Sequence, residues 1–330
     1  MDPEQIYTST GTKLLLHGQA IEDLRNGKNH PITLHVMTTE VCNLECVFCS
    51  VAQRGSQGKW LPDLSMDQIR CVVMELIPLG LKAVILSGGG DPTIYPQINE
   101  LIDWLHLAHL EIGMITNGIL LSKRIRPATL RKLAWVRISA NTFDYREEIE
   151  IPRIPETTTL GMSYVWNPLT TEKIINKVKQ YVVGHRVKYV RVLSDCQLSS
   201  PDLDRAQDEL MGIVAKLGPP FFHQNKRHAM PAQCHLGRVR PCLYTDGLIY
   251  PCDSVTLNSP GDNKKFHEDY AICKWNEVHQ FFNNGTKGSL IDTQKCPHCV
   301  FTRQNNLLMD VINGKPLPPA PADTTHRNFV

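Results

Sequence analysis

Hydrophobic residues along the chain follow two alternating patterns. Short runs of branched and apolar residues predict strands at 32–37, 82–86, 111–115, 135–138, 159–165 and 189–193. Between several of them, apolar residues recur every three or four positions and predict helices at 66–77, 95–107, 127–133 and 171–182. The first of these helices has Ser65 as its expected N-cap and Pro78 just past its end.

Repeated strand–helix units joined by short turns predict an α/β fold with a parallel sheet. Six such strands would make an incomplete (β/α)6 TIM-type barrel. In barrels of this kind, the chemistry lies at the carboxyl ends of the strands. The polar motifs of this chain follow the predicted strands at that end.

The chain has 330 residues, which favours one large domain and a smaller one. We expect an N-terminal extension at 1–30, the barrel at 31–216 and a cysteine-rich domain at 217–312. The last segment, 313–330, is rich in proline and poor in apolar residues, and we expect it to be disordered.

Composition indicates an intracellular protein. Hydrophobic residues make up 42% of the chain, no apolar run reaches membrane-spanning length, and the first residues lack a secretory signal. Eleven cysteines in such a chain predict metal binding in a reducing compartment, and we expect a cytoplasmic location with no membrane contact.

The net charge is only +2, but the basic residues are unevenly placed. Residues 210–245 contain no Asp or Glu and include Arg238 and Arg240, and a second basic stretch runs from 173 to 191. Such runs are most often solvated surface. Because the first surrounds a cysteine of the C-terminal group, we also consider an anionic substrate.

Three cysteines in one loop are the strongest chemical signal. Cys42, Cys46 and Cys49 have the spacing C-x3-C-x2-C, and each can bind one iron of a cubane cluster and leave the fourth iron open. A C-x2-C pair alone is more often part of a zinc site or a redox pair. No His or further Cys follows Cys49 within twenty residues to complete a zinc site, so the pattern favours a 4Fe–4S cluster.

This loop, with Phe48 just before its third cysteine, resembles the signature of the radical S-adenosylmethionine (SAM) superfamily. The turn Gly88-Gly89-Gly90-Asp91-Pro92 resembles the Gly-Gly-Glu-Pro turn of that family, with Asp91 in place of the usual glutamate. The resemblance implies that Phe48 lies beside the adenine of SAM and that the glycine turn binds its methionine amino group. It also implies that Asn117 and Ser139, at the next strand ends, contact its ribose and carboxylate. Without the resemblance, Asn117 would begin a tight turn and Ser139 would be a helix cap.

A second cysteine group lies near the C-terminus. Asp246-Gly247 predicts a hairpin turn between cysteines, and a C-x2-C pair follows much later. The region resembles the SPASM domain, or its shorter twitch form, which carries auxiliary clusters. The resemblance implies one auxiliary 4Fe–4S cluster. Its expected ligands are Cys234, Cys252, Cys296 and Cys299, and Cys242 is an alternative to Cys234.

The resemblance implies an enzyme that reductively cleaves SAM to a 5′-deoxyadenosyl radical, which then removes a hydrogen atom from a substrate. A reductant such as flavodoxin or ferredoxin would be its partner. From the basic segments we hypothesise an anionic substrate, either a nucleotide or a modified base in nucleic acid. One alternative is a peptide or another small molecule, and another is a non-catalytic metal protein that binds nucleic acid.

Overall fold

The computed structural model describes residues 2–9, 12–49, 60–226, 229–254, 270–285, 287–294, 296 and 299–330. The chain divides into two compact units. The first unit consists of Met1–Thr38, Leu61–Ile85 and His228–Val330, and the second of Thr39–Trp60 and Leu86–Arg227. Both units are therefore discontinuous in sequence.

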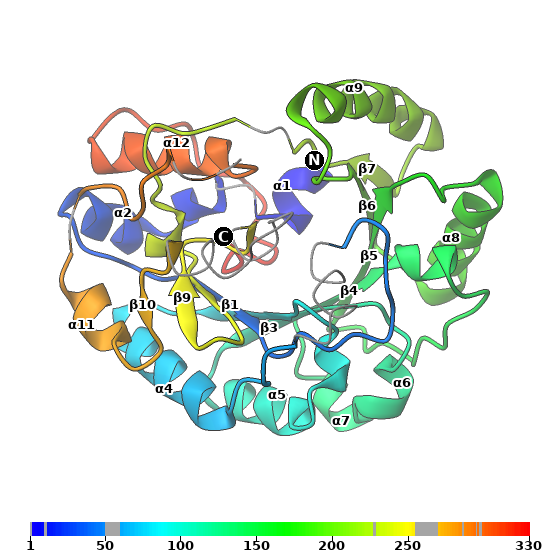
Figure 1. Ribbon diagram of the computed structural model, residues 1–330, viewed down its shortest axis with the longest axis horizontal. Coiled ribbons are helices and arrows are strands. Elements are labelled where there is room, and N and C mark those ends of the chain that lie inside the picture. The colour runs from blue at the N-terminus through cyan, green and yellow to red at the C-terminus, as the bar shows by residue number, and fades with distance from the viewer. Residues whose placement is uncertain are drawn as a thin grey trace. The chain divides into compact units, whose positions relative to one another are not determined.

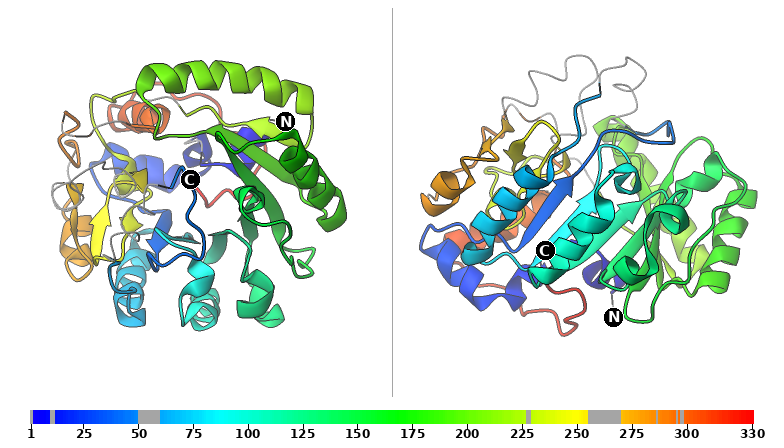
Figure 2. Two further views of the ribbon diagram at one scale, coloured as in Figure 1. Left: turned by 45° about the vertical axis from the view of Figure 1, so that its right-hand side comes forward. Right: turned by 90° about the horizontal axis from the view of Figure 1, so that it is seen from below.

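Parallel strands of the second unit run in the order β3-β4-β5-β6-β7 (Figure 1). Helices follow most of these strands along the chain, and α9 packs against β6 and β7 (Figure 2). The strands are β3 (Glu111–Thr116), β4 (Trp135–Ser139), β5 (Thr159–Trp166), β6 (Tyr189–Ser194) and β7 (Phe221–His223). The helices are η3 (Pro92–Ile94), α5 (Ile98–Leu107), α6 (Leu121–Arg124), α7 (Pro127–Leu130), η4 (Ala140–Asp144), α8 (Glu172–His185) and α9 (Ser200–Leu217).

The register of these strands determines which side chains share a face. Ser139, the last residue of β4, pairs with Ser163 on β5, and Ser163 pairs with Arg191 on β6. Paired residues of a sheet point to the same side. Ser139, Ser163 and Arg191 therefore form one row across three strands.

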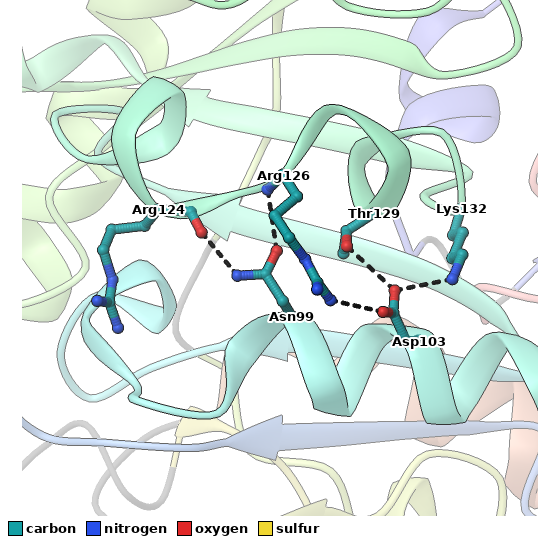
Figure 3. Close-up of polar contacts among 6 residues, drawn as sticks. All are labelled: Asn99, Asp103, Arg124, Arg126, Thr129 and Lys132. Atoms are coloured by element: carbon teal, nitrogen blue, oxygen red, sulfur yellow. Dashed lines mark hydrogen bonds and ion pairs between the residues drawn. The ribbon is translucent and has the colours of Figure 1, made fainter.

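A polar cluster joins α5 to the segment around α7 (Figure 3). Asp103 accepts hydrogen bonds from Arg126 (2.7 Å), Lys132 (2.8 Å) and Thr129 (3.1 Å), while Asn99 accepts one from the Arg126 amide (2.9 Å). Partial burial is the largest single effect and disfavours the charged form of Asp103, but the hydrogen bonds from Lys132 and Thr129 and the charges of Lys132 and Arg126 together lower its pKa.

The first unit has the strand order β10-β9-β8-β1-β2. Strand β8 is parallel to β1 and antiparallel to β9, and β9 is antiparallel to β10. Its strands are β1 (Thr33–Met37), β2 (Ala83–Ser87, with its last two residues in the second unit), β8 (Cys242–Leu243), β9 (Leu248–Tyr250) and β10 (Cys273–Lys274). Its helices are α1 (Pro3–Tyr7), η1 (Thr12–Leu16), α2 (Gly18–Arg25), α4 (Met66–Leu76), η2 (Ile77–Leu79), η5 (Leu236–Arg238), α11 (Val278–Asn283) and α12 (Thr302–Ile312).

Several local predictions are confirmed. Ser65 caps α4 in a capping box with Gln68, and the hairpin turn at Asp246-Gly247 joins β8 to β9, with Gly247 at φ 77°. The expected helix at 95–107 starts later, at Ile98, because the chain first forms the short helix η3. Among the described residues, no helix is both long and apolar enough to cross a membrane.

The units differ from the domains that we expected, because the C-terminal part of the chain groups with Met1–Thr38 and Leu61–Ile85. Strand β8 pairs directly with β1, through His35 with Cys242 and Val36 with Leu243. The cysteine-rich segment thus extends the sheet that contains β1. This pairing explains why the N-terminal residues and α4 group with the C-terminal part of the chain.

The C-terminal segment differs from the disordered tail that we expected. Phe329 and Val330 are buried, and the Val330 amide donates a hydrogen bond to the Thr33 hydroxyl (3.0 Å). The Thr33 hydroxyl in turn donates to the Asn328 carbonyl (2.7 Å), and Arg327 donates to the Leu16 carbonyl (2.6 Å). The last apolar residues and these backbone contacts hold a segment whose proline content alone suggested disorder.

Candidate active site

The cysteine loop lies in the second unit and follows β1 along the chain. Cys42, Cys46 and Cys49 are all partly buried, and the Cys49 amide donates to the Cys46 carbonyl (2.9 Å). Burial, with a smaller contribution from the neighbouring thiols, raises the pKa of Cys42 to about 11 and that of Cys46 to about 12. Metal binding would therefore release protons from these thiols.

The glycine turn packs directly against the entry to this loop. The Gly90 amide donates to the Thr39 carbonyl (2.9 Å), and the Asp91 amide donates to the Val41 carbonyl (3.0 Å). A β-carbon on Gly90 would lie 2.0 Å from the Val41 carbonyl oxygen, and one on Gly88 would lie 2.2 Å from the Gly90 carbonyl oxygen. Glycine is therefore required here for the approach of two backbone segments. The turn that contains Gly88, Gly89 and Gly90 thus lies next to the residues that precede Cys42.

Asp91 connects this turn to the end of β3. Its buried carboxylate accepts hydrogen bonds from the amide and hydroxyl of Thr93, from the hydroxyl of Thr116 (2.9 and 3.0 Å) and from the amide of Asn117 (2.6 Å). Both oxygens of the carboxylate therefore accept hydrogen bonds within the protein. Asp91 thus fixes the glycine turn to the end of β3.

Asn117 connects β3 to the cysteine loop. Its Nδ2 donates to Asn43 Oδ1 (2.6 Å) and to the Cys42 sulfur (3.7 Å), and its Oδ1 accepts from the Ile119 amide (3.0 Å). The tight turn predicted from Asn-Gly is present, because Gly118 has φ 82°. Asn117 thus holds the first cysteine in addition to any contact with SAM.

Ser139 lies at the end of β4, and Phe48 lies within the cysteine loop. Ser139 is the N-cap residue of η4, as expected from the sequence, but its side chain makes no capping hydrogen bond. The Phe48 carbonyl accepts a hydrogen bond from the Gln197 side chain, which follows β6. The loop is therefore also held from the end of β6.

Sequence reasoning missed two residues beside the cysteines. The Tyr145 hydroxyl accepts a hydrogen bond from the Val47 amide (2.8 Å), which lies between the second and third cysteines. Asp144 accepts hydrogen bonds from the Tyr164 hydroxyl (2.8 Å) and from Asn167 (2.9 Å), and its charge contributes to the raised pKa of Cys46. Their place just beyond the end of β4 is the signal that could have identified them.

A second cysteine site lies in the first unit. Cys234, Cys252, Cys296 and Cys299 all line one cavity, whose other walls include Leu236, Phe301 and Asn305. Cys242 is absent from this lining. It is fully buried in a cluster with Met37, Tyr244, Tyr250 and Tyr270. The structure therefore favours Cys234 over Cys242 as the fourth member of the set.

The arginines near Cys234 do not form the anion-binding surface that the charge pattern suggested. Arg238 is 1% exposed, and its guanidinium donates to Asn29 Oδ1 (2.7 Å) and to the Gly288 carbonyl (2.6 Å). Arg240 is also buried and forms an ion pair with Asp253 (3.5 Å). Arg238 thus stabilises the first unit and is not part of an exposed basic surface.

The donor sets suit iron–sulfur clusters. Among the described side chains, no three His, Cys, Asp or Glu groups converge closely enough to hold a single metal ion. A cubane takes one cysteine on each iron, so its ligands surround a cluster and do not converge on one point. Three thiols in one loop and four around one cavity provide ligand sets of this kind.

The fold is that of an incomplete TIM-type barrel. A solved structure of tagged anSMEcpe with bound AdoMet aligns with this chain at a TM-score of 0.50, with 15% identity, and covers 84% of this chain and 85% of that one. The alternating strands and helices of the second unit agree with this architecture.

The family model of the radical SAM superfamily matches residues 36–160, a range that contains the cysteine loop, the glycine turn, Asn117 and Ser139. Residues 36–160 of the chain are thus similar to this superfamily. Its members bind a 4Fe–4S cluster and SAM, and SPASM-type members carry auxiliary clusters.

Two curated relatives illustrate the range of matches. The mycofactocin maturase MftC of Mycobacterium ulcerans is 36% identical over 115 residues, which are 34% of this chain and 29% of that protein. The GTP 3′,8-cyclase of Aliarcobacter butzleri is 23% identical over 285 residues, which are 73% of this chain and 87% of that protein. The chain thus spans less than a third of the length of the maturase.

Proposed function

We propose that this chain is a radical SAM enzyme that acts on an anionic substrate of the nucleotide class. The observation that carries the enzymatic part is the hydrogen-bonded junction of Asp91, Asn117 and Cys42. It joins the glycine turn and the end of β3 to the cysteine loop within one unit. When bound, the cluster and SAM supply a 5′-deoxyadenosyl radical, which removes a hydrogen atom from the substrate.

The residues of the second unit would have the following roles in binding the cluster and SAM. Cys42, Cys46 and Cys49 would hold the 4Fe–4S cluster that activates SAM. The backbone of the glycine turn, with Phe48 and Ser139, binds and orients SAM. Asn117 fixes the position of the first cysteine through its bonds to Cys42 and Asn43.

We assign one auxiliary 4Fe–4S cluster to the cavity in the first unit, with Cys234, Cys252, Cys296 and Cys299 as ligands. The cavity wall is otherwise largely apolar, which limits solvent access to a bound cluster. Electrons would come from a flavodoxin or ferredoxin. We place the reaction in the cytoplasm, where thiols stay reduced.

Two observations support a nucleotide substrate. The GTP 3′,8-cyclase is matched over most of its length, and a relative from Flammeovirga pacifica, 25% identical over 56% of this chain, is an S-adenosylmethionine-dependent nucleotide dehydratase.

Arg191 lies in the same row as Ser139 across β4, β5 and β6. Its guanidinium donates to Gln224 Oε1 (3.0 Å), which holds one side of the group in place. A cation in this row would attract a phosphate toward the SAM site.

The test of substrate class uses anaerobically reconstituted protein, SAM, a strong reductant and deuterated nucleotides. We expect deuterium to appear in 5′-deoxyadenosine for one nucleotide, and we expect Arg191→Gln to raise KM for it at least ~10-fold while Arg191→Lys retains most of the affinity. Arg126→Gln, which alters the exposed cluster of Figure 3, is the matched control. Transfer of deuterium from a peptide or a neutral metabolite alone would contradict the nucleotide assignment.

A further inference from the structure

Asn305 lies at the wall of the auxiliary cavity and is almost completely buried, with 1% exposure. It belongs to the first turn of α12, which starts at Thr302. Its Oδ1 accepts two backbone hydrogen bonds, from the amides of His235 (2.7 Å) and Leu236 (3.1 Å). These two residues directly follow Cys234.

The two amides lie at the N-terminal end of the short helix η5. The first N–H groups of a helix have no partner within the helix, and they usually bind a capping side chain or water. His235, at the N-cap of η5, makes no capping hydrogen bond of its own. Asn305 supplies the acceptor from a distant part of the chain and thereby fixes the backbone next to Cys234.

The other end of the same side chain reaches Cys299. Asn305 Nδ2 donates to the Cys299 sulfur (3.9 Å) and to the Phe301 carbonyl (3.3 Å). The Phe301 amide donates to the same sulfur (3.3 Å). Hydrogen bonds to the sulfur ligands of an iron–sulfur cluster are among the factors that set its reduction potential.

We infer that Asn305 is a positioning residue of the auxiliary site, which fixes Cys234 relative to Cys299 and raises the reduction potential of the cluster bound there. The inference rests on the auxiliary cluster proposed above. A donor to a sulfur ligand stabilises the more negative, reduced cluster, so the loss of this donor lowers the potential. Because the side chain is buried, water cannot readily replace it.

The experiment uses the full chain with Cys42, Cys46 and Cys49 all changed to Ala, so that the auxiliary cluster is measured alone. In this background we compare Asn305→Leu, which removes donor and acceptor, with Asn305→Asp, which keeps an acceptor for the two amides. Gln304→Leu is the matched control on the same helix, since the Gln304 side chain donates to the Ser9 carbonyl (2.7 Å). The readouts are bound iron, the rate of iron loss to a chelator, and the midpoint potential from an EPR-monitored titration.

We expect about four irons per chain in the background variant. Both Asn305 variants should have a lower midpoint potential than the Gln304→Leu control, and Asn305→Leu should also lose iron several-fold faster. If the background variant binds about four irons and neither Asn305→Asp nor Asn305→Leu changes its potential, the inference about this residue is wrong while the auxiliary cluster stands. If the background variant binds no iron at all, both the auxiliary cluster and the inference fall.

Discussion

The carboxylate of Asp91 holds the candidate active site together through hydrogen bonds that the amide of an asparagine would not fully reproduce. It accepts hydrogen bonds from Thr93, Thr116 and Asn117, and two of the donors are backbone amides, one to each carboxylate oxygen. In Asp91→Asn, either rotamer of the amide turns an NH2 group toward one of these backbone N–H groups. One charge-assisted hydrogen bond is lost and the others weaken, for a total of about 3 kcal/mol.

A cost of about 3 kcal/mol corresponds to roughly a 100-fold change in an equilibrium constant. Hydrogen exchange of the amides at the end of β3 measures this opening directly. We expect the Asn117 amide to exchange about 100-fold faster in Asp91→Asn than in the unmodified protein. Because Asn117 also holds Cys42, the variant should retain less iron after anaerobic reconstitution.

Asp103→Asn is the matched control, because Asp103 also accepts several hydrogen bonds but is 31% exposed. Exposed ion pairs contribute at most about 1 kcal/mol, so this variant should change exchange near α5 by less than about 10-fold and leave Asn117 unaffected. Equal exchange at Asn117 in Asp91→Asn and in the unmodified protein would refute the reasoning about the junction.

Three further predictions concern single positions. Gly90→Ala places a carbon 2.0 Å from the Val41 carbonyl oxygen, and it should destabilise the apo-protein by more than about 2 kcal/mol in urea unfolding and abolish iron binding at the first site. Cys242→Ala should lower stability by about 1–2 kcal/mol but leave the iron content unchanged, since this thiol is buried among Met37 and three tyrosines and does not line the auxiliary cavity; loss of about four irons would show that it is a ligand. Burial lowers the pKa of His17, whose Nε2 contacts the Arg327 carbonyl (3.0 Å). Its neutral form therefore stabilises the folded state fully above the unfolded pKa of about 6.5, and this stability falls as the pH drops below that value. The protection factors of the 324–330 amides, which are the intrinsic exchange rates divided by the observed rates, should therefore fall from about pH 7 to about pH 5 and lose this dependence in His17→Gln.

Much of the second unit could be predicted from sequence because its strands and helices are long enough to show a period. The strand that ends at Ser139 is an example, and in the first unit so is the helix capped by Ser65. The cysteine loop and the glycine turn were also predictable, since their chemistry depends on residues close together in sequence. Strand β8 has two residues, Cys242 and Leu243, and two residues carry no periodicity. Its pairing with β1 was therefore invisible.

The errors concerned residues whose role depends on distant partners. Arg238 has the sequence context of a basic surface, yet Asn29 and Gly288 bind its guanidinium in the fold. Asn305 has no local motif at all, and it lies at the cavity lined by Cys234 and Cys299 only because of the position of α12. The tail was expected to be disordered from its proline content, but Phe329 and Val330 provide apolar surface that a composition average hides.

The most direct test of the central claim is the release of 5′-deoxyadenosine from SAM by anaerobically reconstituted protein in the presence of a reductant. We predict about eight irons per chain and steady formation of 5′-deoxyadenosine. Cys42→Ala should abolish this product, whereas Cys71→Ala, which changes a cysteine on α4, should retain it. Zinc in place of iron, or equal product from the unmodified protein and Cys42→Ala, would contradict the assignment of this chain as a radical SAM enzyme.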